Sequence, residues 1–336
     1  MHTVLVTGGA GFIGSHFLHV LQQCDEVTRY INCDALTYAG RRERVAALET
    51  DPRYRFVQAD VCDLQAMQSL FARYDIDTVV HFAAQSHVDR SIADPQAFVR
   101  TNVMGTATLL EAARCAWAEG PHGYRQGVRF LHISTDEVYG SLQTGRFTEN
   151  SPLAPRNPYA ASKASAELWV QAYHTTYGLP TLIARCCNQF GSHQHPEKFI
   201  PHMVACAMAN RPLPVYGDGL QVREWMAVDE GCRALQTLLA RGALGEVYNV
   251  GSGCERTNLW MAEQIVDFLH QTWDASIDRD WIAHVKDRAG HDRRYAVDTS
   301  KIQALGWRPS MDASAFLQAL QQTVQWYVAH PKALEY

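Results

Sequence analysis

The sequence predicts an α/β fold, namely a Rossmann-type doubly wound parallel sheet with a smaller C-terminal α/β lobe. Three observations predict this class. A glycine-rich turn follows the first apolar strand, apolar runs alternate with helical segments up to about residue 190, and Pro and Gly break the remaining chain into short pieces. Repeated strand and helix units of this kind form parallel sheets with right-handed crossovers. We therefore expect two parts, residues 1–190 and residues 191–336, with later segments returning to the first.

Length, charge and cysteine content further limit the classes of protein to which the chain can belong. A chain of 336 residues with 47% hydrophobic and 19% charged residues has the composition of a globular protein with a large core. Its net charge of −5 gives no general reason to bind nucleic acid or an anionic membrane. No apolar run reaches the roughly 18 residues of a membrane span. The nine cysteines include no C-x-x-C pair, and we see no signal peptide, so we expect reduced thiols and a cytoplasmic location.

The glycine-rich turn is the first functional motif. Residues 3–6 form the first predicted strand, and Gly8, Gly11 and Gly14 lead from it into a helix. Glycine at these positions lets the backbone approach a pyrophosphate closely at the helix N-terminus. Asp34 ends the next strand 20 positions after Gly14, where an acid should receive the ribose hydroxyls of a dinucleotide. The alternative is an ordinary tight turn with a solvated aspartate.

Two further apolar strands are predicted, at 55–59 and 78–82. The first leads into Asp60 and Val61, and an acid there either faces an adenine or caps the following helix; the pattern leaves both open. The second ends at Ala83 and Ala84, small residues suited to a cofactor lying across the strand tip. The chain continues with a long helix, a loop and a buried strand, at 95–117, 120–127 and 129–133.

This buried strand ends in a hydroxyl and two carboxylic acids, Thr135, Asp136 and Glu137. Open α/β sheets keep their ligands at strand ends of this kind. Because adjacent side chains of a regular strand face opposite ways, both acids reach one ligand only if the strand ends at Asp136. Two acids in one pocket suggest several proton transfers. The alternative is a surface acid pair at a turn.

A helical pattern over 159–177 places Tyr159 and Lys163 on one face, since the two are four residues apart. A cation beside a phenol favours the phenolate and lowers the pKa of the phenol. Tyr159 is therefore a candidate base for a sugar hydroxyl, and Lys163 can also hold a ribose. The alternative is an exposed tyrosine with a surface lysine.

Basic side chains are the main signal beyond the sixth predicted strand, 181–185. They are candidates for holding a diphosphate, although most basic residues are solvated surface. The candidates are Lys198, Arg223, Lys286, Arg288, Arg293 and Arg294. His193 and His195 form an H-x-H pattern, but no carboxylate or Cys cluster accompanies it, so we expect no metal.

Together these motifs resemble the extended short-chain dehydrogenase/reductases, and within them the nucleotide-sugar 4,6-dehydratases. The resemblance runs from Val4 to about Pro309. It rests on residues 7–14, 36–40, 86–91, 134–140, 159–163, 196–201, 214–219 and 287–294. Asp136 and Glu137 are the discriminating pair, because sugar epimerases of the superfamily usually carry non-acidic residues there and related decarboxylases usually keep only the Glu. Among the dehydratases the pattern is most similar to members that act on dTDP-glucose.

The resemblance implies a lyase mechanism with tightly bound NAD. Tyr159, assisted by Thr135 and Lys163, takes the proton of the sugar 4-hydroxyl, and hydride passes from C4 to NAD. Glu137 removes the C5 proton and Asp136 protonates the 6-hydroxyl, so that water leaves. Hydride then returns to C6, giving a 4-keto-6-deoxy sugar. Three alternatives stay open: the same reaction on a UDP-, GDP- or CDP-hexose, a UDP-sugar 4-epimerase or decarboxylase reaction, and a non-catalytic NAD-binding regulator.

The resemblance also assigns binding residues, position by position. Residues 1–190 become the NAD-binding domain and residues 191–336 mainly the nucleotide-sugar lobe. Those expected to face NAD are Gly8, Gly11, Phe12, Ile13, Gly14, Asp34, Thr37, Gly40, Asp60, Val61, Ala83, Ala84, Thr101, Tyr159, Lys163 and Gln189. Those expected to line the nucleotide-sugar site are Ser86, Thr135, Asn188, Lys198, Phe199, Pro214, Tyr216, Arg223, Asn258, Asp287 and His291. In the family, the helices that match 95–117 and 159–177 pair across a two-fold axis, which implies a homodimer.

Several positions depart from the pattern of the dTDP-glucose members, and they gather around the substrate lobe. They are Ala35, Arg41, Gln85, Gln189, His193, His195, Ala227 and Ala289. These departures leave the expected chemistry intact, but they leave the nucleotide and the hexose open.

Overall fold

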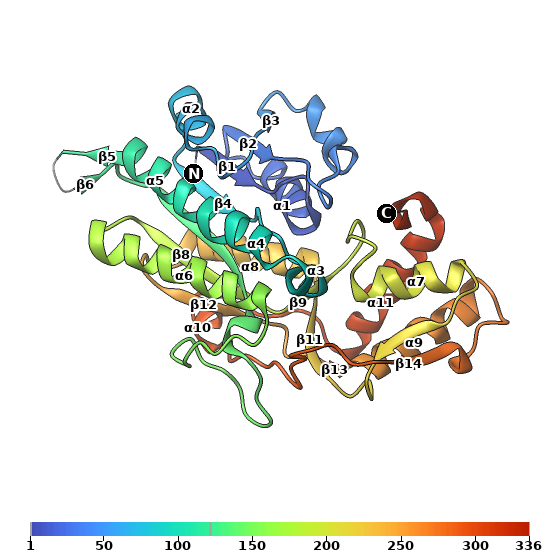
Figure 1. Ribbon diagram of the computed structural model, residues 1–336. Helices are drawn as coiled ribbons and strands as arrows, with labels where there is room; N and C mark the ends of the chain where they lie inside the picture. Colours follow the sequence, from blue (N-terminus) through green and yellow to red (C-terminus); the bar gives the residue numbers. More distant parts are fainter. Residues whose placement is uncertain (1, 121–122, 336) are drawn as a thin grey trace.

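A seven-stranded parallel sheet forms the centre of the protein, whose computed structural model describes residues 2–120 and 123–335 (Figure 1). The strand order is β12-β8-β7-β4-β1-β2-β3. Its strands are β1 (Thr3–Thr7), β2 (Arg29–Asp34), β3 (Tyr54–Gln58), β4 (Thr78–His81), β7 (Arg129–Thr135), β8 (Thr181–Cys186) and β12 (Val247–Val250). The chain order reverses at β1 and β4, and this is the kind of point where doubly wound sheets bind ligands. The predicted fold class is confirmed.

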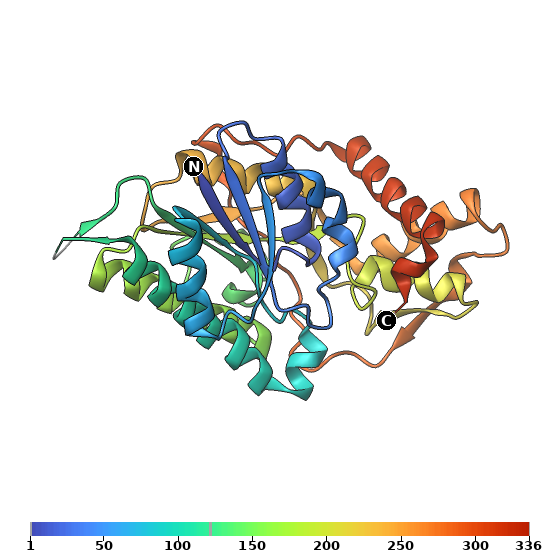
Figure 2. The same cartoon turned by 90° about the horizontal axis from the view of Figure 1, so that it is seen from above.

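Helices cover both faces of this sheet, as Figure 2 shows from above. One layer consists of α2 (Leu64–Tyr74), α5 (Gly105–Trp117) and α6 (Pro158–Tyr177), and the other of α1 (Phe12–Gln22), α8 (Val228–Arg241) and the 3₁₀ segment η1 (Arg42–Thr50). Side chains of β1 alternate between the layers, since Val4 and Val6 join the core under α1 and α8 while Leu5 joins the core under α2 and α5. Burying each such aliphatic side chain contributes about 1.5–3 kcal/mol.

The C-terminal lobe has a core of its own. It is built from α7 (Phe199–Met208), α9 (Asn258–Thr272) and α11 (Ala313–Ala329), with Ile200, Met261 and Phe316 buried among them. The chain also forms two small sheets outside the main one: parallel β10 (Leu213–Tyr216) and β14 (Ile282–Val285), and β9 (Asn188–Phe190), β11 (Val222–Ala227) and β13 (Glu255–Thr257). Shorter elements are α3 (Val88–Ala93), α4 (Pro95–Phe98), α10 (Ser300–Gln303), η4 (Arg279–Trp281) and η5 (Pro331–Leu334).

Two segments differ from the prediction. The helix expected over 95–117 is interrupted by a π-helical turn, η2 (Val99–Met104), between α4 and α5. The loop expected over 120–127 contains part of a short antiparallel pair, β5 (Ala118–Glu119) and β6 (Gly123–Tyr124), and residues 121–122 lie outside the described residues. Across 2–120 and 123–335, no helix has the length and apolar character needed to cross a membrane.

Candidate active site

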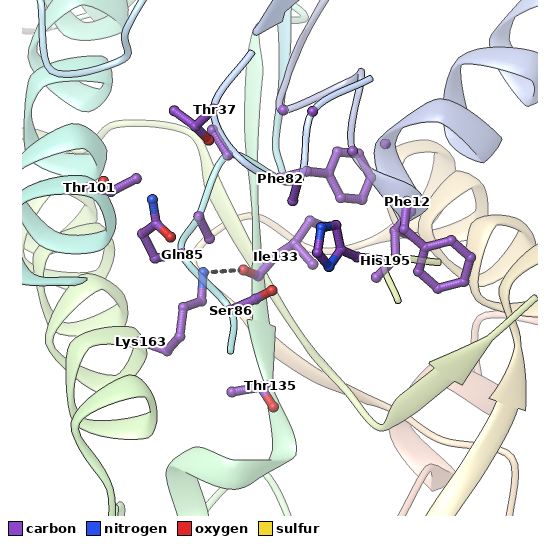
Figure 3. Close-up of a pocket in the computed structure, with 18 of the residues that line it drawn as sticks. Phe12, Thr37, Phe82, Gln85, Ser86, Thr101, Ile133, Thr135, Lys163 and His195 are labelled. Atoms are coloured by element: carbon purple, nitrogen blue, oxygen red, sulfur yellow. Dashed lines mark hydrogen bonds between the residues drawn. The ribbon is translucent and has the colours of Figure 1, made fainter. Parts of the chain in front are cut away.

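A cavity opens at the carboxyl ends of the central strands, where the topology predicts a ligand site (Figure 3). It is lined by the ends of β1, β2, β4, β7 and β8, by the start of α1 and α6, and by the loop that leads into α7. Every residue expected to face NAD lines this cavity, and so do all five expected catalytic residues. Chain segments more than 150 residues apart in sequence therefore meet around one space.

The glycine-rich turn brings the backbone close to the tip of β4. A Cβ atom on Gly8, whose φ is +71°, would lie 2.6 Å from the backbone nitrogen of Ala83, and one on Gly14 would lie 2.4 Å from the carbonyl oxygen of Gly8. Only glycine fits this packing. Gly11 precedes the first turn of α1 without a side-chain cap, so the first N–H groups of the helix face the cavity end. They form a suitable site for a pyrophosphate.

Asp34 lies at the end of β2, beside this turn. Its carboxylate accepts hydrogen bonds from the backbone N–H groups of Ala10, at 2.9 Å, and Leu36, at 2.8 Å. Burial raises the pKa of this carboxyl, while the two backbone donors act in the opposite direction. Gly40 packs against it, since a Cβ there would meet Asp34 Oδ1 at 2.8 Å. The carboxylate is thus fixed at the wall of the cavity that is expected to hold the ribose.

Asp60 also lines the cavity, and the sequence left its role open between adenine contact and helix cap. Its carboxylate accepts the backbone N–H of Cys62, at 2.9 Å. The cap of α2 is Asp63 instead, which accepts the N–H of Ala66. The capping alternative is therefore wrong for Asp60.

Strand β7 ends at Thr135, and Asp136 begins a 3₁₀ turn, η3 (Asp136–Tyr139). The strand therefore stops where the sequence analysis required, so that both neighbouring carboxyls line the cavity. Thr135 Oγ1 donates to Asp136 Oδ1 at 3.2 Å and accepts the backbone N–H of Glu137 at 3.3 Å. The threonine hydroxyl thereby fixes the two acids relative to each other.

The two acids have different surroundings. Asp136 is 1% exposed, and its pKa is raised well above the ordinary value, first by burial and then by the charges of Glu137 and Glu224. Within the described residues its Oδ2 atom has no hydrogen-bond partner. Glu137 Oε2 accepts the side-chain amide of Asn157, at 3.2 Å, and the hydroxyl of Tyr295, at 3.5 Å. Burial therefore favours the protonated form of Asp136, while Glu137 accepts two side-chain hydrogen bonds.

Tyr159 and Lys163 both lie in the first turns of α6 and line the cavity, but their expected interaction is not present. Lys163 Nζ donates to the carbonyl oxygen of Ile133 at 2.6 Å (dashed in Figure 3) and lies 3.4 Å from Nε2 of His132. The pKa of Tyr159 is raised by burial and by Glu137, and a hydrogen bond with Thr135 acts against this. The prediction that the lysine lowers the pKa of the phenol is wrong here, because the ammonium is held against strand β7. Burial lowers the pKa of Lys163 to about 8.

The residues expected at the nucleotide-sugar site divide into two groups. Ser86, Thr135, Asn188 and Lys198 line the cavity. The other seven do not: Phe199, Pro214, Tyr216, Arg223, Asn258, Asp287 and His291.

Several of these seven contact other side chains or backbone groups instead. Tyr216 and His291 make an edge-to-face ring contact, and Tyr216 donates to Asp89. Arg223, the expected diphosphate clamp, instead donates to the carbonyl oxygens of Val222 and Asp292 and covers the ring of Tyr295.

Several cavity residues were not predicted from the sequence. Phe82, Arg44, Cys186, Cys187, Gln194 and Glu197 are among the lining residues. Three of them carried a signal, since Phe82 and Cys186 lie at the ends of predicted strands and Glu197 lies in the motif 196–201. The described residues contain no group of three His, Cys, Asp or Glu side chains that could hold a metal ion, and His195 instead lies on the cavity wall, in edge contact with Tyr38.

Together, the fold and this site define an NAD-dependent enzyme of the short-chain dehydrogenase/reductase type with an added pair of acids. The family model described as GDP-mannose 4,6-dehydratase matches residues 5–320. The chain belongs to this family of nucleotide-sugar dehydratases, as its resemblance predicted.

Comparison with individual proteins shows which members of this family the chain resembles. The chain is 49% identical to a dTDP-glucose 4,6-dehydratase of Xanthomonas campestris, over 98% of this chain and 94% of the relative. It is 45% identical to a dTDP-glucose 4,6-dehydratase of Streptomyces venezuelae solved with NAD bound, with a TM-score of 0.90 over 99% of both chains. A UDP-glucuronic acid 4-epimerase of Bacillus cereus is more distant, at 28% identity and a TM-score of 0.83 over 96% of this chain and 99% of that one.

Proposed function

We propose that the chain dehydrates dTDP-glucose to the 4-keto-6-deoxy sugar with NAD as its resident cofactor. The observation that carries this proposal is the acid pair: Asp136 and Glu137 leave the end of β7 into the cavity that Tyr159 and Lys163 also line. Hydride chemistry alone needs no such pair, whereas elimination of water needs both a base and an acid. The substrate is taken from the relatives, which are dTDP-glucose 4,6-dehydratases at 45–49% identity.

The residues of the cavity fit NAD. The uncapped start of α1 offers N–H groups to the pyrophosphate, and the close packing of Gly8 and Gly14 leaves no side chain in its way. Asp34 presents a fixed carboxylate to the ribose hydroxyls, and Thr101, on η2, lies on the same cavity wall. Bound NAD would supply the oxidant that accepts hydride from C4 and the reductant that returns it to C6.

The proton transfers are assigned to the chain's own residues. Tyr159 accepts the proton of the 4-hydroxyl, and a hydrogen bond with Thr135 acts against the burial that raises the pKa of its phenol. Glu137 takes the proton from C5, which a ketone at C4 acidifies. Asp136 gives its proton to the 6-hydroxyl, and the C6–O bond breaks to release water. Lys163, whose Nζ donates to the carbonyl oxygen of Ile133, brings a positive charge to the cavity wall.

We propose that the two parts of the chain bind different ligands, as the resemblance implies. Residues 1–190 hold NAD, together with α8 and β12, which pack on the main sheet from beyond residue 191. Residues 191–336 mainly hold the nucleotide sugar. Lys198, which lines the cavity and donates to the carbonyl oxygen of Ser86 at 2.7 Å, is placed to meet a phosphate.

A homodimer in the cytoplasm completes the proposal. Large apolar side chains are exposed along the helix layer that the family uses for pairing: Val99, Met104, Leu168, Trp169 and Tyr177. An exposed apolar patch of this kind is typical of an interface. All nine cysteines are free thiols, which suits a reducing compartment.

Incubation with dTDP-, UDP-, GDP- and CDP-glucose, followed by mass spectrometry, tests the substrate. We expect loss of one water from dTDP-glucose and a product that absorbs in alkali. Loss of water from another nucleotide alone would move the assignment to that nucleotide. A product with C6 intact and C4 inverted would identify an epimerase, and no change in any of the four would favour a regulator.

A further inference from the structure

Glu197 connects three segments that are far apart in sequence. Its Oε1 atom accepts the hydroxyl of Tyr38 at 2.9 Å, and its Oε2 atom accepts Nε of Arg90 at 2.9 Å. Tyr38 belongs to the loop after β2, Arg90 to α3, and Glu197 to the loop before α7. The guanidinium of Arg90 also covers the ring of Tyr38, 4.0 Å from its centroid. The three side chains therefore form one closed cluster, the Tyr38–Arg90–Glu197 cluster.

This cluster joins walls of the cofactor cavity. Thr37, Ala39 and Gly40 flank Tyr38 and line the cavity, and Glu197 and Lys198 line it from the loop before α7. Figure 3 shows Thr37, of the loop after β2, and His195, of the loop before α7, around the same space as Ser86, which precedes α3. The loop after β2 and the loop before α7 cannot separate unless the hydrogen bond between Tyr38 and Glu197 breaks. A second tie secures the loop after β2, since Arg44 donates to the carbonyl oxygen of Ala39 at 2.7 Å.

Burial and charge strengthen the hydrogen bonds that the Glu197 carboxylate accepts in this cluster. The side chain of Glu197 is 6% exposed, whereas that of Arg90 is 47% exposed. A hydrogen bond between charged groups in such a partly dry setting is stronger than one between exposed groups. Removal of the carboxylate leaves Arg90 free to be solvated, so the fold itself should survive the change.

We propose that Glu197 is a positioning residue that retains NAD by holding the loop after β2 and the loop before α7 together across the cavity. This inference rests on the proposed function only in taking NAD as the cofactor. Glu197 acts through Tyr38 and Arg90 and takes no part in the chemistry. An enzyme that regenerates its cofactor in every turnover gains from slow cofactor release, because each released NAD interrupts the cycle.

Glu197→Gln in the full-length protein tests the proposal. The glutamine keeps the shape of the side chain but loses its charge. We expect NAD to dissociate about 10- to 100-fold faster, as loss of a charge-assisted hydrogen bond predicts. The readouts are the NAD content of the purified protein after gel filtration and the release rate of NAD followed by dilution. Turnover should be low without added NAD and should return to near the wild-type value at saturating NAD.

Two further variants sharpen the test. Tyr38→Phe removes only one hydrogen bond, so it should accelerate NAD release less than Glu197→Gln does. If Glu197→Gln does not fold, the NAD release rate of Tyr38→Phe still tests the proposal. Glu246→Gln is the matched control, because Glu246 pairs with Lys301 at 2.7 Å and does not line the cavity. It should retain NAD like the wild type.

NAD release at the wild-type rate in both Glu197→Gln and Tyr38→Phe would overturn the inference. So would a loss of turnover in Glu197→Gln that saturating NAD does not restore. Failure of the proposed function is separate from either result. In that case the wild-type protein would retain NAD and yet form no dehydrated sugar.

Discussion

At the scale of single residues, two neighbouring carboxyls have different surroundings, and these suit the different roles that we propose for them. Asp136 is buried, and its raised pKa favours the protonated form. Glu137 Oε2 accepts hydrogen bonds from Asn157 and Tyr295. Separating an acid from a base in this way lets both steps of an elimination occur at one pH.

Glu137→Gln tests the base. The variant should bind NAD, and addition of dTDP-glucose should oxidise C4, but the C5 proton then has no acceptor. We expect turnover to fall about 10²- to 10⁴-fold, the usual contribution of a positioned general base. Absorbance of reduced cofactor should accumulate and persist, while the alkali-absorbing product should not form. Full turnover in this variant would show that another group removes the proton.

Asp136→Asn tests the buried acid through stability. Because the pKa of Asp136 is raised in the folded protein, the native state keeps a proton that the unfolded chain releases above about pH 4. Wild-type stability therefore decreases as pH rises from about 4 toward the raised pKa. Asparagine does not ionise, so its free energy of unfolding lacks this pH dependence. Relative to the wild type, the variant should therefore become more stable by up to about 1.4 kcal/mol for each pH unit in this range.

Urea unfolding of both proteins at pH 5 and pH 8 measures this difference. If the difference in free energy of unfolding between the variant and the wild type stays constant or decreases as pH rises, Asp136 is ionised in the folded state. Turnover of Asp136→Asn should be low at both pH values, because an amide cannot protonate the leaving hydroxyl.

Sequence reasoning located the acids but not all side-chain contacts. Thr135, Asp136 and Glu137 follow from the end of an apolar strand. The anchoring of Lys163 on Ile133 could not be predicted, because it depends on where the neighbouring strand presents a carbonyl oxygen. Glu197 was missed as a contact residue because its partners lie 159 and 107 positions away along the chain.

At the scale of elements, the turn after β7 determines where both acids point. Gly140 ends η3 with φ of +78°, and a Cβ there would lie 2.4 Å from the carbonyl oxygen of Ala154. The turn is therefore pressed against the segment that leads to α6. We therefore expect the positions of the acids to depend on this close contact.

Gly140→Ala should disturb that arrangement. A residue forced into a rarely populated backbone region costs about 1–3 kcal/mol, and here a steric conflict adds to the cost. We expect a lower urea midpoint and a larger loss of turnover than of NAD binding. Gly145→Ala is the control, since Gly145 has φ of +80° but nothing within 4 Å of an added Cβ. Equal effects of the two substitutions would argue against the packing explanation.

The six predicted strands of the main sheet and the helix that carries Tyr159 are present in the structure, because periodicity and turn residues are local signals. The π-helical turn η2 could not be predicted in this way. Within this turn, the side chain of Asn102 accepts the N–H of Gln85 and donates to the hydroxyl of Ser162, contacts 17 and 60 positions away that no local pattern shows. π-Helical turns often occur at functional sites, and this one places Thr101 on the cavity wall.

At the scale of the whole molecule, the active site and the proposed dimer interface share one helix. α6 carries Tyr159 and Lys163 at its start, and Leu168 and Trp169 one to two turns further on. Pairing through this helix would fix the position of the catalytic groups as well as bury apolar surface. Association and activity should therefore be connected.

Leu168→Asp tests the interface. Leu168 is 57% exposed, so an aspartate there should not unfold the chain, but it would place a charge in an apolar contact. Light scattering after gel filtration should give a dimer for the wild type and a monomer for the variant. Leu244→Asp, at an exposed leucine outside the helix layer, should leave the dimer intact. A variant with the mass of the wild type would place the interface elsewhere.

The most direct test of the central claim follows the hydrogen on C4. The enzyme is incubated with dTDP-glucose carrying deuterium at C4, and the product is analysed by mass spectrometry and NMR. We predict loss of one water and recovery of the deuterium on C6 of a 4-keto-6-deoxy sugar, since bound NAD would supply the acceptor and the donor of the same hydride. Deuterium that remains on C4 of an intact hexose, or that is lost to solvent without dehydration, would contradict the account.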